Sequence, residues 1–392
     1  MDPTTNAPGA WYFQALPEIK VTKPGETPPP SINAMDATIP VLDMNDWARP
    51  ETQDRFTQTL KDACQNVGFF AVVNTNIDPE ILDGAYAVAE KFFHQDPQDK
   101  MEIHVPGANG QRGYVQSESA KGTAFKDCKE FIHIGPPMNE EQEARLQFGK
   151  NVWPTGIDLE TPMMELYSEL REYAIPLQQA LSSAIGEEPG FLHEMTEEGD
   201  VLMRVLHYPE NAPTGVPWAS AHTDINLFTI LPRSTADGLQ VQSPDGTWID
   251  VKVPDGSIIV NVGDILQNMT NGLFCSSVHQ VQDPGDGQER FSIVMFIHPR
   301  SEDEMSPRPK MIEQTDGVAK YPTATRIELL AERLADLDLA DDGLLQLLSN
   351  SNLCERNIAL GKASRDAMER LEIAGYASDE VKAELSRLRR GM

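Results

Sequence analysis

Between residues 201 and 300 the chain consists of short runs of branched or aromatic residues that are separated by turn-forming residues. Runs of this length and spacing are typical of an antiparallel β-sandwich or barrel. One separator, Ser243-Pro244-Asp245-Gly246, has the composition of a hairpin turn. The expected strands are 202–208, 227–231, 238–242, 248–251, 257–262 and 291–297. The sequence therefore predicts a mainly β domain here.

Helical patterns flank this β region on both sides. Upstream, expected strands at 39–42 and 69–73 alternate with amphipathic helices, and a long helix is expected at 161–185. Downstream, helical patterns recur at 326–339 and 366–390. We therefore divide the chain into four parts: a proline-rich arm at 1–38, an N-terminal α/β region at 39–200, the β domain at 201–300 and a helical C-terminal extension at 301–392.

Composition argues against several classes of partner. The chain has 32 basic and 61 acidic side chains, and its formal net charge of −29 repels nucleic acids and anionic membranes. Its 4 cysteines are widely spaced, which favours a reducing compartment. The first residues lack the pattern of a signal peptide, and no apolar run is long enough for a membrane span. We therefore expect a cytoplasmic protein.

The β region contains a candidate metal site. His222 and Asp224 are two residues apart, and on a strand this spacing directs both side chains to one face. His279 lies in another strand-like context downstream. Two imidazoles and one carboxylate leave three positions of an octahedron open, which suits non-haem Fe(II) and O₂ chemistry, whereas zinc usually adopts a tetrahedral shell.

A second pair of residues completes this arrangement. Arg290 and Ser292 are also two residues apart and would share a face of the last expected strand. The guanidinium can hold a carboxylate through two hydrogen bonds, and the hydroxyl can add a third donor. A metal site beside such a clamp predicts a keto-acid cosubstrate. Taken alone, Arg290 would be interpreted more readily as part of a surface ion pair.

Together these residues resemble the isopenicillin N synthase-like family of Fe(II)/2-oxoglutarate-dependent dioxygenases. The resemblance covers about residues 39 to 300, and segments 39–43 and 66–74 resemble the region that precedes the catalytic domain in this family. The motifs of the catalytic domain are His222-Thr223-Asp224, Gly238-Leu239-Gln240-Val241, Val260-Asn261-Val262-Gly263-Asp264, His279 and Arg290-Phe291-Ser292.

The resemblance implies a fold, a reaction and a set of site residues. The fold would be a double-stranded β-helix, which is a distorted jelly roll, with flanking helices. The enzyme would use Fe(II), 2-oxoglutarate and O₂ to oxidise a small organic molecule, most often by hydroxylation, with release of succinate and CO₂. The residues implied are His222, Asp224 and His279 for the metal, and Arg290, Ser292 and Tyr208 for the cosubstrate.

Three other interpretations stay open at the level of sequence. The same scaffold could be an oxidase that needs no 2-oxoglutarate, or a non-catalytic jelly roll that binds a metal or a metabolite. Cys275 could act as a nucleophile with His279, although buried packing explains this cysteine better. The C-terminal extension could cover the mouth of the site or pair two subunits, and the substrate-binding residues are not indicated.

Overall fold

The strands of this computed structural model form two facing sheets. It describes residues 38–117, 126–146, 149–210, 212–213 and 216–390, so the expected arm at 1–38 lies outside the described residues except for Thr38. The main sheet has the order β1-β2-β10-β7-β12-β5-β4-β3 and the smaller sheet the order β6-β11-β8-β9. Only β1 and β2 pair in parallel among these described neighbours.

The strand bounds agree closely with the expected runs. Every run predicted between 202 and 297 forms a strand, and the turn at 243–246 joins β8 to β9. The strands are β1 (Val41–Asp43), β2 (Phe69–Val73), β3 (Gly113–Val115), β4 (Glu130–Ile134), β5 (Leu202–Tyr208), β6 (Ala219–His222), β7 (Phe228–Leu231), β8 (Leu239–Gln242), β9 (Trp248–Asp250), β10 (Ile258–Val262), β11 (His279–Val281) and β12 (Arg290–Ile297).

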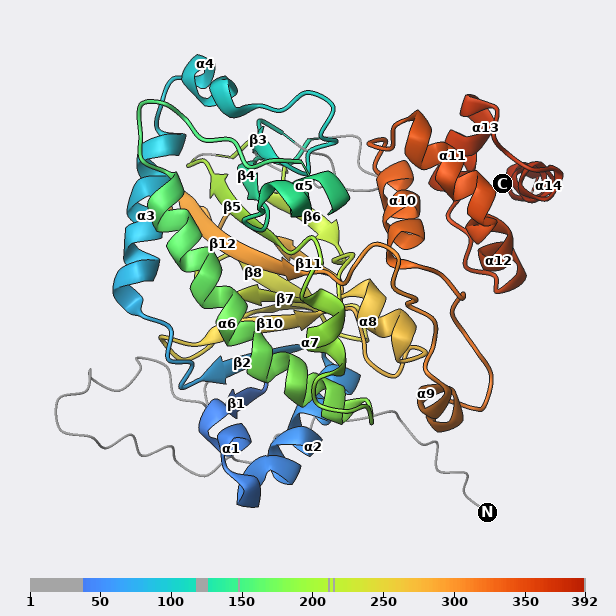
Figure 1. Cartoon of the computed structure of the whole chain (residues 1–392), viewed down its shortest axis with the longest axis horizontal. Helices are drawn as coiled ribbons and strands as arrows, with labels where there is room; N and C mark the ends of the chain where they lie inside the picture. The colour runs from blue at the N-terminus through green and yellow to red at the C-terminus, as the bar shows by residue number, and fades with distance from the viewer. Residues whose placement is uncertain (1–37, 118–125, 147–148, 211, 214–215, 391–392) are drawn as a thin grey trace.

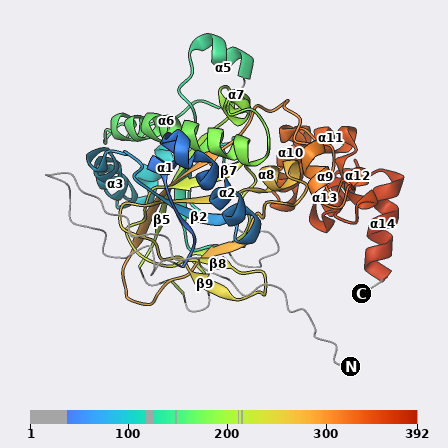
Figure 2. The ribbon, with the colours of Figure 1, turned by 90° about the horizontal axis from the view of Figure 1, so that it is seen from below.

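Figure 2 shows three layers: helices, the main sheet and the smaller sheet. Between the sheets, Phe69 and Ile259 of the main sheet pack in one apolar cluster with Val241 of the smaller sheet. The other face of the main sheet carries the helices, and α6 crosses it diagonally (Figure 1). Burial of apolar surface on both faces of the main sheet explains why its central strands are rich in hydrophobic residues. This arrangement is the predicted double-stranded β-helix with flanking helices.

The helices before the β domain follow their apolar stripes. Phe56, Leu60 and Cys64 are buried on one side of α2, which begins with Pro50 at its first position. The helices of this region are α1 (Met44–Ala48), α2 (Pro50–Asn66), α3 (Pro79–Phe93), α4 (Pro97–Lys100), the 3₁₀-helix η2 (Met101–Ile103), α5 (Glu140–Leu146), α6 (Glu160–Ala184) and α7 (Phe191–Thr196).

Gly68, between α2 and β2, provides a stability prediction. Its φ is +67°, and a Cβ there would lie 1.9 Å from the carbonyl oxygen of Cys275. We expect Gly68→Ala to lower the free energy of unfolding by about 2 kcal/mol, because backbone strain and overpacking add. Gly246→Ala is the control, since its φ is +89° but nothing lies within 4 Å of the added Cβ. Denaturant titration measures the free energy of unfolding of both variants. Equal losses in Gly68→Ala and Gly246→Ala would contradict a role for the close approach of the Cys275 carbonyl oxygen.

The C-terminal extension is a cluster of helices at one end of the sheets (Figure 1). A capping box between Thr325 and Glu328 begins α10. The 366–390 pattern is divided into two helices, because Gly375 adopts φ 82° at the end of α13. After α8 (Asp264–Met269) in the β domain, the helices are α9 (Pro309–Gln314), α10 (Arg326–Asp336), α11 (Asp342–Ser351), α12 (Leu353–Ala359), α13 (Arg365–Ala374) and α14 (Asp379–Arg390).

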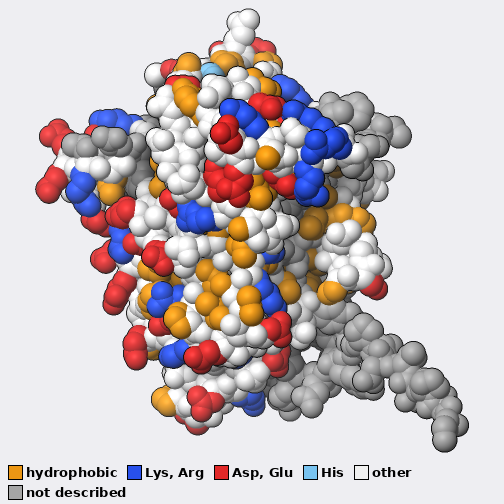
Figure 3. Space-filling view, turned by 90° about the vertical axis from the view of Figure 1, so that its right-hand side faces the viewer, with side chains coloured by type: hydrophobic (Ala, Val, Ile, Leu, Met, Phe, Trp, Pro, Cys, Tyr) orange, Lys and Arg blue, Asp and Glu red, His pale blue; other side chains and the backbone are white. Residues whose placement is uncertain are grey.

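The surface on the side of this extension is mixed in character. Figure 3 shows acidic and basic side chains interspersed with hydrophobic ones. Ion pairs such as Arg389 with Glu372 and Arg370 with Asp338 lie among these helices. Within the described ranges, no helix combines the length and the apolar character that crossing a bilayer requires.

Candidate active site

The three candidate metal ligands come together at the end of the smaller sheet. His222 is the last residue of β6 and His279 the first of β11, and the two are directly paired across these strands. Asp224 lies in the loop after β6, so the expectation that it shares a strand face with His222 is wrong. The loop instead turns the carboxylate back, and Asp224 Oδ1 lies 3.8 Å from Nε2 of each histidine.

The backbone orients both imidazole rings. Nδ1 of His222 donates to the carbonyl oxygen of Ser220 at 2.7 Å, and Nδ1 of His279 donates to that of Ser277 at 3.2 Å. Each Nε2 therefore presents its lone pair toward Asp224. Burial and the neighbouring His279 lower the pKa of His222 to about 3, so this ring is neutral near pH 7. One ligand atom from each of the three residues lies within 4.8 Å of the other two.

Two polar side chains hold the carboxylate of Asp224. Its Oδ2 accepts a hydrogen bond from Thr229 Oγ1 at 2.5 Å and another from Asn261 Nδ2 at 2.9 Å. Burial alone would raise the pKa of Asp224, but His279, His222 and these two donors hold it at about 2. The carboxylate is therefore charged, with Oδ1 directed toward the two Nε2 atoms.

Asn261→Ala should weaken metal binding without removing a ligand. Loss of a partner that orients a metal ligand costs about 10–100-fold in metal affinity, so we expect the Kd for Fe(II) to rise by that factor under anaerobic titration. Asn357→Ala is a matched control, because Asn357 is also buried and donates to Glu332 in the C-terminal extension. An equal change in both variants would mean that general destabilisation is responsible.

The predicted clamp residues line a small chamber of about 70 Å³ beside the metal-ligand candidates. Arg290 and Ser292 are on one face of β12 and only 1% and 2% exposed. Arg290 Nε donates to the carbonyl oxygen of Ala236, while its Nη1 has no hydrogen-bond partner among the described residues. The Tyr208 ring lies 5.0 Å from the guanidinium carbon. The chamber thus contains a buried cation with an unused donor, which fits a carboxylate.

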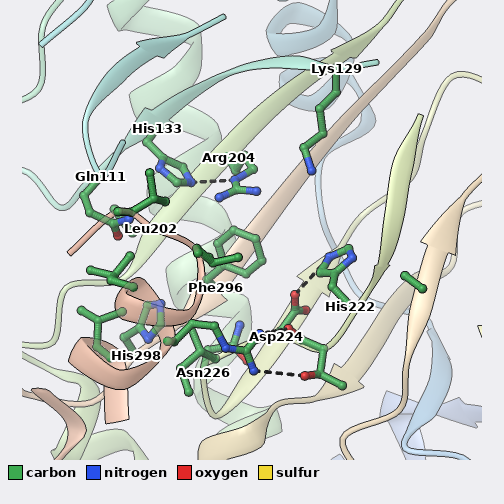
Figure 4. Close-up of a pocket in the computed structure, with 18 of the residues that line it drawn as sticks. Gln111, Lys129, His133, Leu202, Arg204, His222, Asp224, Asn226, Phe296 and His298 are labelled. Carbon is green, nitrogen blue, oxygen red and sulfur yellow. Dashed lines mark hydrogen bonds and ion pairs between the residues drawn. The ribbon is translucent and has the colours of Figure 1, made fainter. Parts of the chain in front are cut away.

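A larger cavity of about 580 Å³ is lined by His222 and Asp224 (Figure 4). Its polar residues include Lys129, which precedes β4, His133 of β4 and Arg204 of β5. Arg204 Nε donates to His133 Nε2 at 2.7 Å, and the guanidinium packs against Phe131 and Phe296. Sequence reasoning missed these basic residues, because nothing in their local pattern separates them from ordinary strand residues.

Helix α10 closes one side of this cavity. Leu330 and Leu334 line it, as does Arg333, which donates to the carbonyl oxygen of Thr223 at 3.1 Å and also bonds Asp264. Asp264 N in turn donates to the carbonyl oxygen of Asp224 at 2.8 Å. The C-terminal extension therefore covers one side of the site and is hydrogen-bonded to the loop that carries Asp224. Covering the site is one of the two roles that the sequence left open.

Cys275 is not part of this site. It lies before β11 and not on it, so the strand geometry assumed for a pair with His279 is absent. Its thiol donates to the carbonyl oxygen of Gln65 at 3.1 Å, and burial raises its pKa. A thiol with a raised pKa is a poor nucleophile, which supports the packing interpretation.

Comparison with known proteins identifies the family. A family model described as the N-terminal region of a non-haem dioxygenase in morphine synthesis matches residues 39–156, and the model of the 2OG-Fe(II) oxygenase superfamily matches residues 199–299. A 2-oxoglutarate-Fe(II) type oxidoreductase of Aspergillus fumigatus is 30% identical over 310 residues, which are 75% of this chain and 91% of the relative. The chain belongs to the 2OG-Fe(II) oxygenase superfamily.

Other relatives agree with this 2OG-Fe(II) oxygenase assignment. Flavanone 3-dioxygenase 2 of Oryza sativa subsp. japonica is 32% identical over 305 residues, which are 74% of this chain and 82% of that protein. The predicted family and the predicted cofactors Fe(II), 2-oxoglutarate and O₂ are therefore confirmed.

Solved structures of 2OG-Fe(II) oxygenases share the fold. A family member from Caulobacter crescentus has a TM-score of 0.69 at 30% identity and covers 76% of this chain and 98% of its own. A full-length protein of Neurospora crassa in complex with alpha-KG has a TM-score of 0.68 at 25% identity, covering 78% of this chain and 98% of its own. A further complex of that Neurospora protein contains thymine. The chain is an Fe(II)/2-oxoglutarate-dependent oxygenase with a double-stranded β-helix fold.

Proposed function

We propose that His222, Asp224 and His279 hold the Fe(II) of this oxygenase. The observation that carries the proposal is the direction of the donor atoms. The other polar atom of each side chain is already hydrogen-bonded, which leaves Nε2, Oδ1 and Nε2 pointing at one another. Two imidazoles and one carboxylate are the facial set that suits non-haem Fe(II). When bound, Fe(II) with 2-oxoglutarate and O₂ supplies the oxidant for an unactivated C–H bond.

We assign the distal carboxylate of 2-oxoglutarate to Arg290 and Ser292. Both side chains are buried in the small chamber that also contains the metal-ligand candidates, and Arg290 Nη1 has a donor to spare among the described residues. Tyr208 borders the chamber and faces the guanidinium. A dicarboxylate placed there would satisfy the buried cation at one end and reach the metal site at the other.

The larger cavity is the proposed substrate site. Its volume of about 580 Å³ lies in the range of about 300–1,000 Å³ that small-molecule sites occupy. Apolar side chains from Phe296 and α10 line it, and Asn226 and His298 are among its polar lining residues. These features favour a small organic substrate with an apolar body and polar groups. Hydroxylation is the proposed outcome.

An anaerobic spectroscopic titration tests the whole arrangement. Fe(II) and then 2-oxoglutarate are added to the metal-free protein, and the weak visible charge-transfer band of iron chelated by a keto acid is followed. We expect the band in the wild type and its loss in Asp224→Ala, because that variant lacks a metal ligand. In Arg290→Ala the band should require much more 2-oxoglutarate.

Other outcomes would contradict this proposal. Iron binding without a band, together with O₂ consumption that does not depend on 2-oxoglutarate, would indicate an oxidase on the same scaffold. Tight Zn(II) binding without any turnover dependent on Fe(II) would indicate a binding module. Titrations of the wild type with Fe(II), Zn(II) and 2-oxoglutarate distinguish these cases. Asp224→Ala is the shared control, because metal binding at this site should depend on Asp224 in each of them.

A further inference from the structure

A second group of metal-binding side chains lies outside the active site. His94, His207 and Glu289 have one ligand atom each within 4.8 Å of the other two. Nε2 of His94 lies 2.9 Å from Glu289 Oε2, and Nε2 of His207 lies 3.0 Å from the same oxygen. The three residues come from the end of α3, from β5 and from the residue before β12. Segments far apart in the sequence thus bring two imidazoles and one carboxylate together.

The group is on the opposite face of the main sheet from the small chamber that Arg290 and Ser292 line. His207 precedes Tyr208 in β5, so the two side chains point to opposite faces, and Tyr208 borders the chamber. His207 is stacked on Phe291 at 4.8 Å, and His94 contacts the same ring edge-on. Figure 1 shows α3 beside the start of β12 on this side of the sheet. The second group is therefore separate from His222, Asp224 and His279.

The His207 ring is held in the orientation that a metal ligand needs. Its Nδ1 lies 2.8 Å from Glu130 Oε1, and Lys100 Nζ donates to both oxygens of Glu130 at 2.8 and 2.7 Å. A carboxylate on one ring nitrogen directs the other nitrogen outward and raises its basicity, as it does at many zinc sites. With Glu130 on Nδ1, Nε2 of His207 is directed at Glu289.

The solvent exposure of these three side chains and the distances between their ligand atoms also fit a bound ion. The side chains of His94 and Glu289 are 47% and 32% exposed, whereas that of His207 is 10% exposed. An ion can therefore enter from solvent and keep water as a further ligand. Zinc–nitrogen bonds of about 2.0–2.1 Å place neighbouring tetrahedral ligands roughly 3.3 Å apart. The observed 2.9 and 3.0 Å are within a few tenths of an ångström of that spacing.

We propose that His94, His207 and Glu289 form a second metal site that takes a borderline divalent ion such as Zn(II). The donor set of two imidazoles and one carboxylate suits this class of ion. A bound ion would tie the end of α3 to β5 and β12, directly behind Arg290. Its role at this position is to hold together the two strands that carry Arg290 and Tyr208.

Zn(II) titration calorimetry of paired variants tests the proposal. In the Asp224→Ala background, where the proposed iron site is impaired, we expect Glu289→Gln to bind one fewer Zn(II) per chain or to bind it at least tenfold more weakly. His104→Gln in the same background is the control, since His104 is an exposed histidine whose Nδ1 bonds the Tyr114 carbonyl. The control should bind Zn(II) like its parent.

Thermal unfolding gives a second readout. Zn(II) should raise the Tm of Asp224→Ala and of its His104→Gln derivative, and raise it less in the Glu289→Gln derivative. If Glu289→Gln does not fold, His94→Gln replaces it, because its exposed side chain tolerates substitution. Unchanged Zn(II) number, affinity and Tm shift in a folded Glu289 or His94 variant would overturn the proposal and leave a hydrogen-bonded network that needs no ion.

Discussion

Asp224→Ala should reduce succinate formation by more than about 100-fold, because the loss of a metal ligand should exceed the 10–100-fold cost of losing a partner that only orients one. Alanine offers no oxygen, and the site loses its negative charge. Thr229 and Asn261 also lose the acceptor for their hydrogen bonds. Succinate release with a verified substrate, together with Fe(II) affinity, measures the effect.

Asp250→Ala is the control for Asp224→Ala. Asp250 is an exposed carboxylate on β9 of the same smaller sheet, where it accepts a hydrogen bond from Gln240. It should keep the activity and iron affinity of the wild type. Full succinate production by a folded Asp224→Ala variant would show that this carboxylate does not bind the metal.

Arg290→Ala has the second large expected effect, an increase in the KM for 2-oxoglutarate of roughly 30-fold or more. Removing one partner of a buried, hydrogen-bonded charge pair costs at least about 2 kcal/mol, and this cost corresponds to that factor. Arg290→Lys should be intermediate, because a lysine keeps the charge but not the planar fork. Steady-state kinetics over a range of 2-oxoglutarate concentrations measures both variants.

Arg290→Ala should weaken 2-oxoglutarate binding without weakening Fe(II) binding. Fe(II) affinity in the absence of 2-oxoglutarate should stay near that of the wild type, since Arg290 is not among the proposed ligands. Arg145→Ala is the control, because Arg145 is an exposed arginine of α5 paired with Glu198. An unchanged KM in Arg290→Ala would place the cosubstrate carboxylate elsewhere.

Patterns within one strand were predicted most successfully. The β domain could be divided into strands because each run alternates with turns, and the shared face of Arg290 and Ser292 follows directly from strand geometry. The same rule gave the wrong geometry for Asp224, since β6 ends at His222 and the next residues turn. The grouping of His222, Asp224 and His279 was therefore easier to predict than their local conformation.

The walls of the site could not be predicted, because they depend on tertiary contacts. Lys129, Arg204 and Leu334 come from parts of the chain that are far apart in sequence and meet only in the folded protein. Asn261 belongs to a motif that the resemblance rests on and Thr229 to none, but neither residue's local pattern shows that it hydrogen-bonds Asp224. No local periodicity reports such partners.

The position of α10 has a consequence for how this protein can be related to others. The superfamily match ends at residue 299, whereas Leu330, Arg333 and Leu334 beyond it form part of the proposed substrate cavity. Under this proposal, the residues that make the chain recognisable differ from some of those that select its substrate. Two relatives with the same iron and cosubstrate residues could differ in substrate through changes in this helix alone. A shared reaction within the superfamily therefore does not imply a shared substrate.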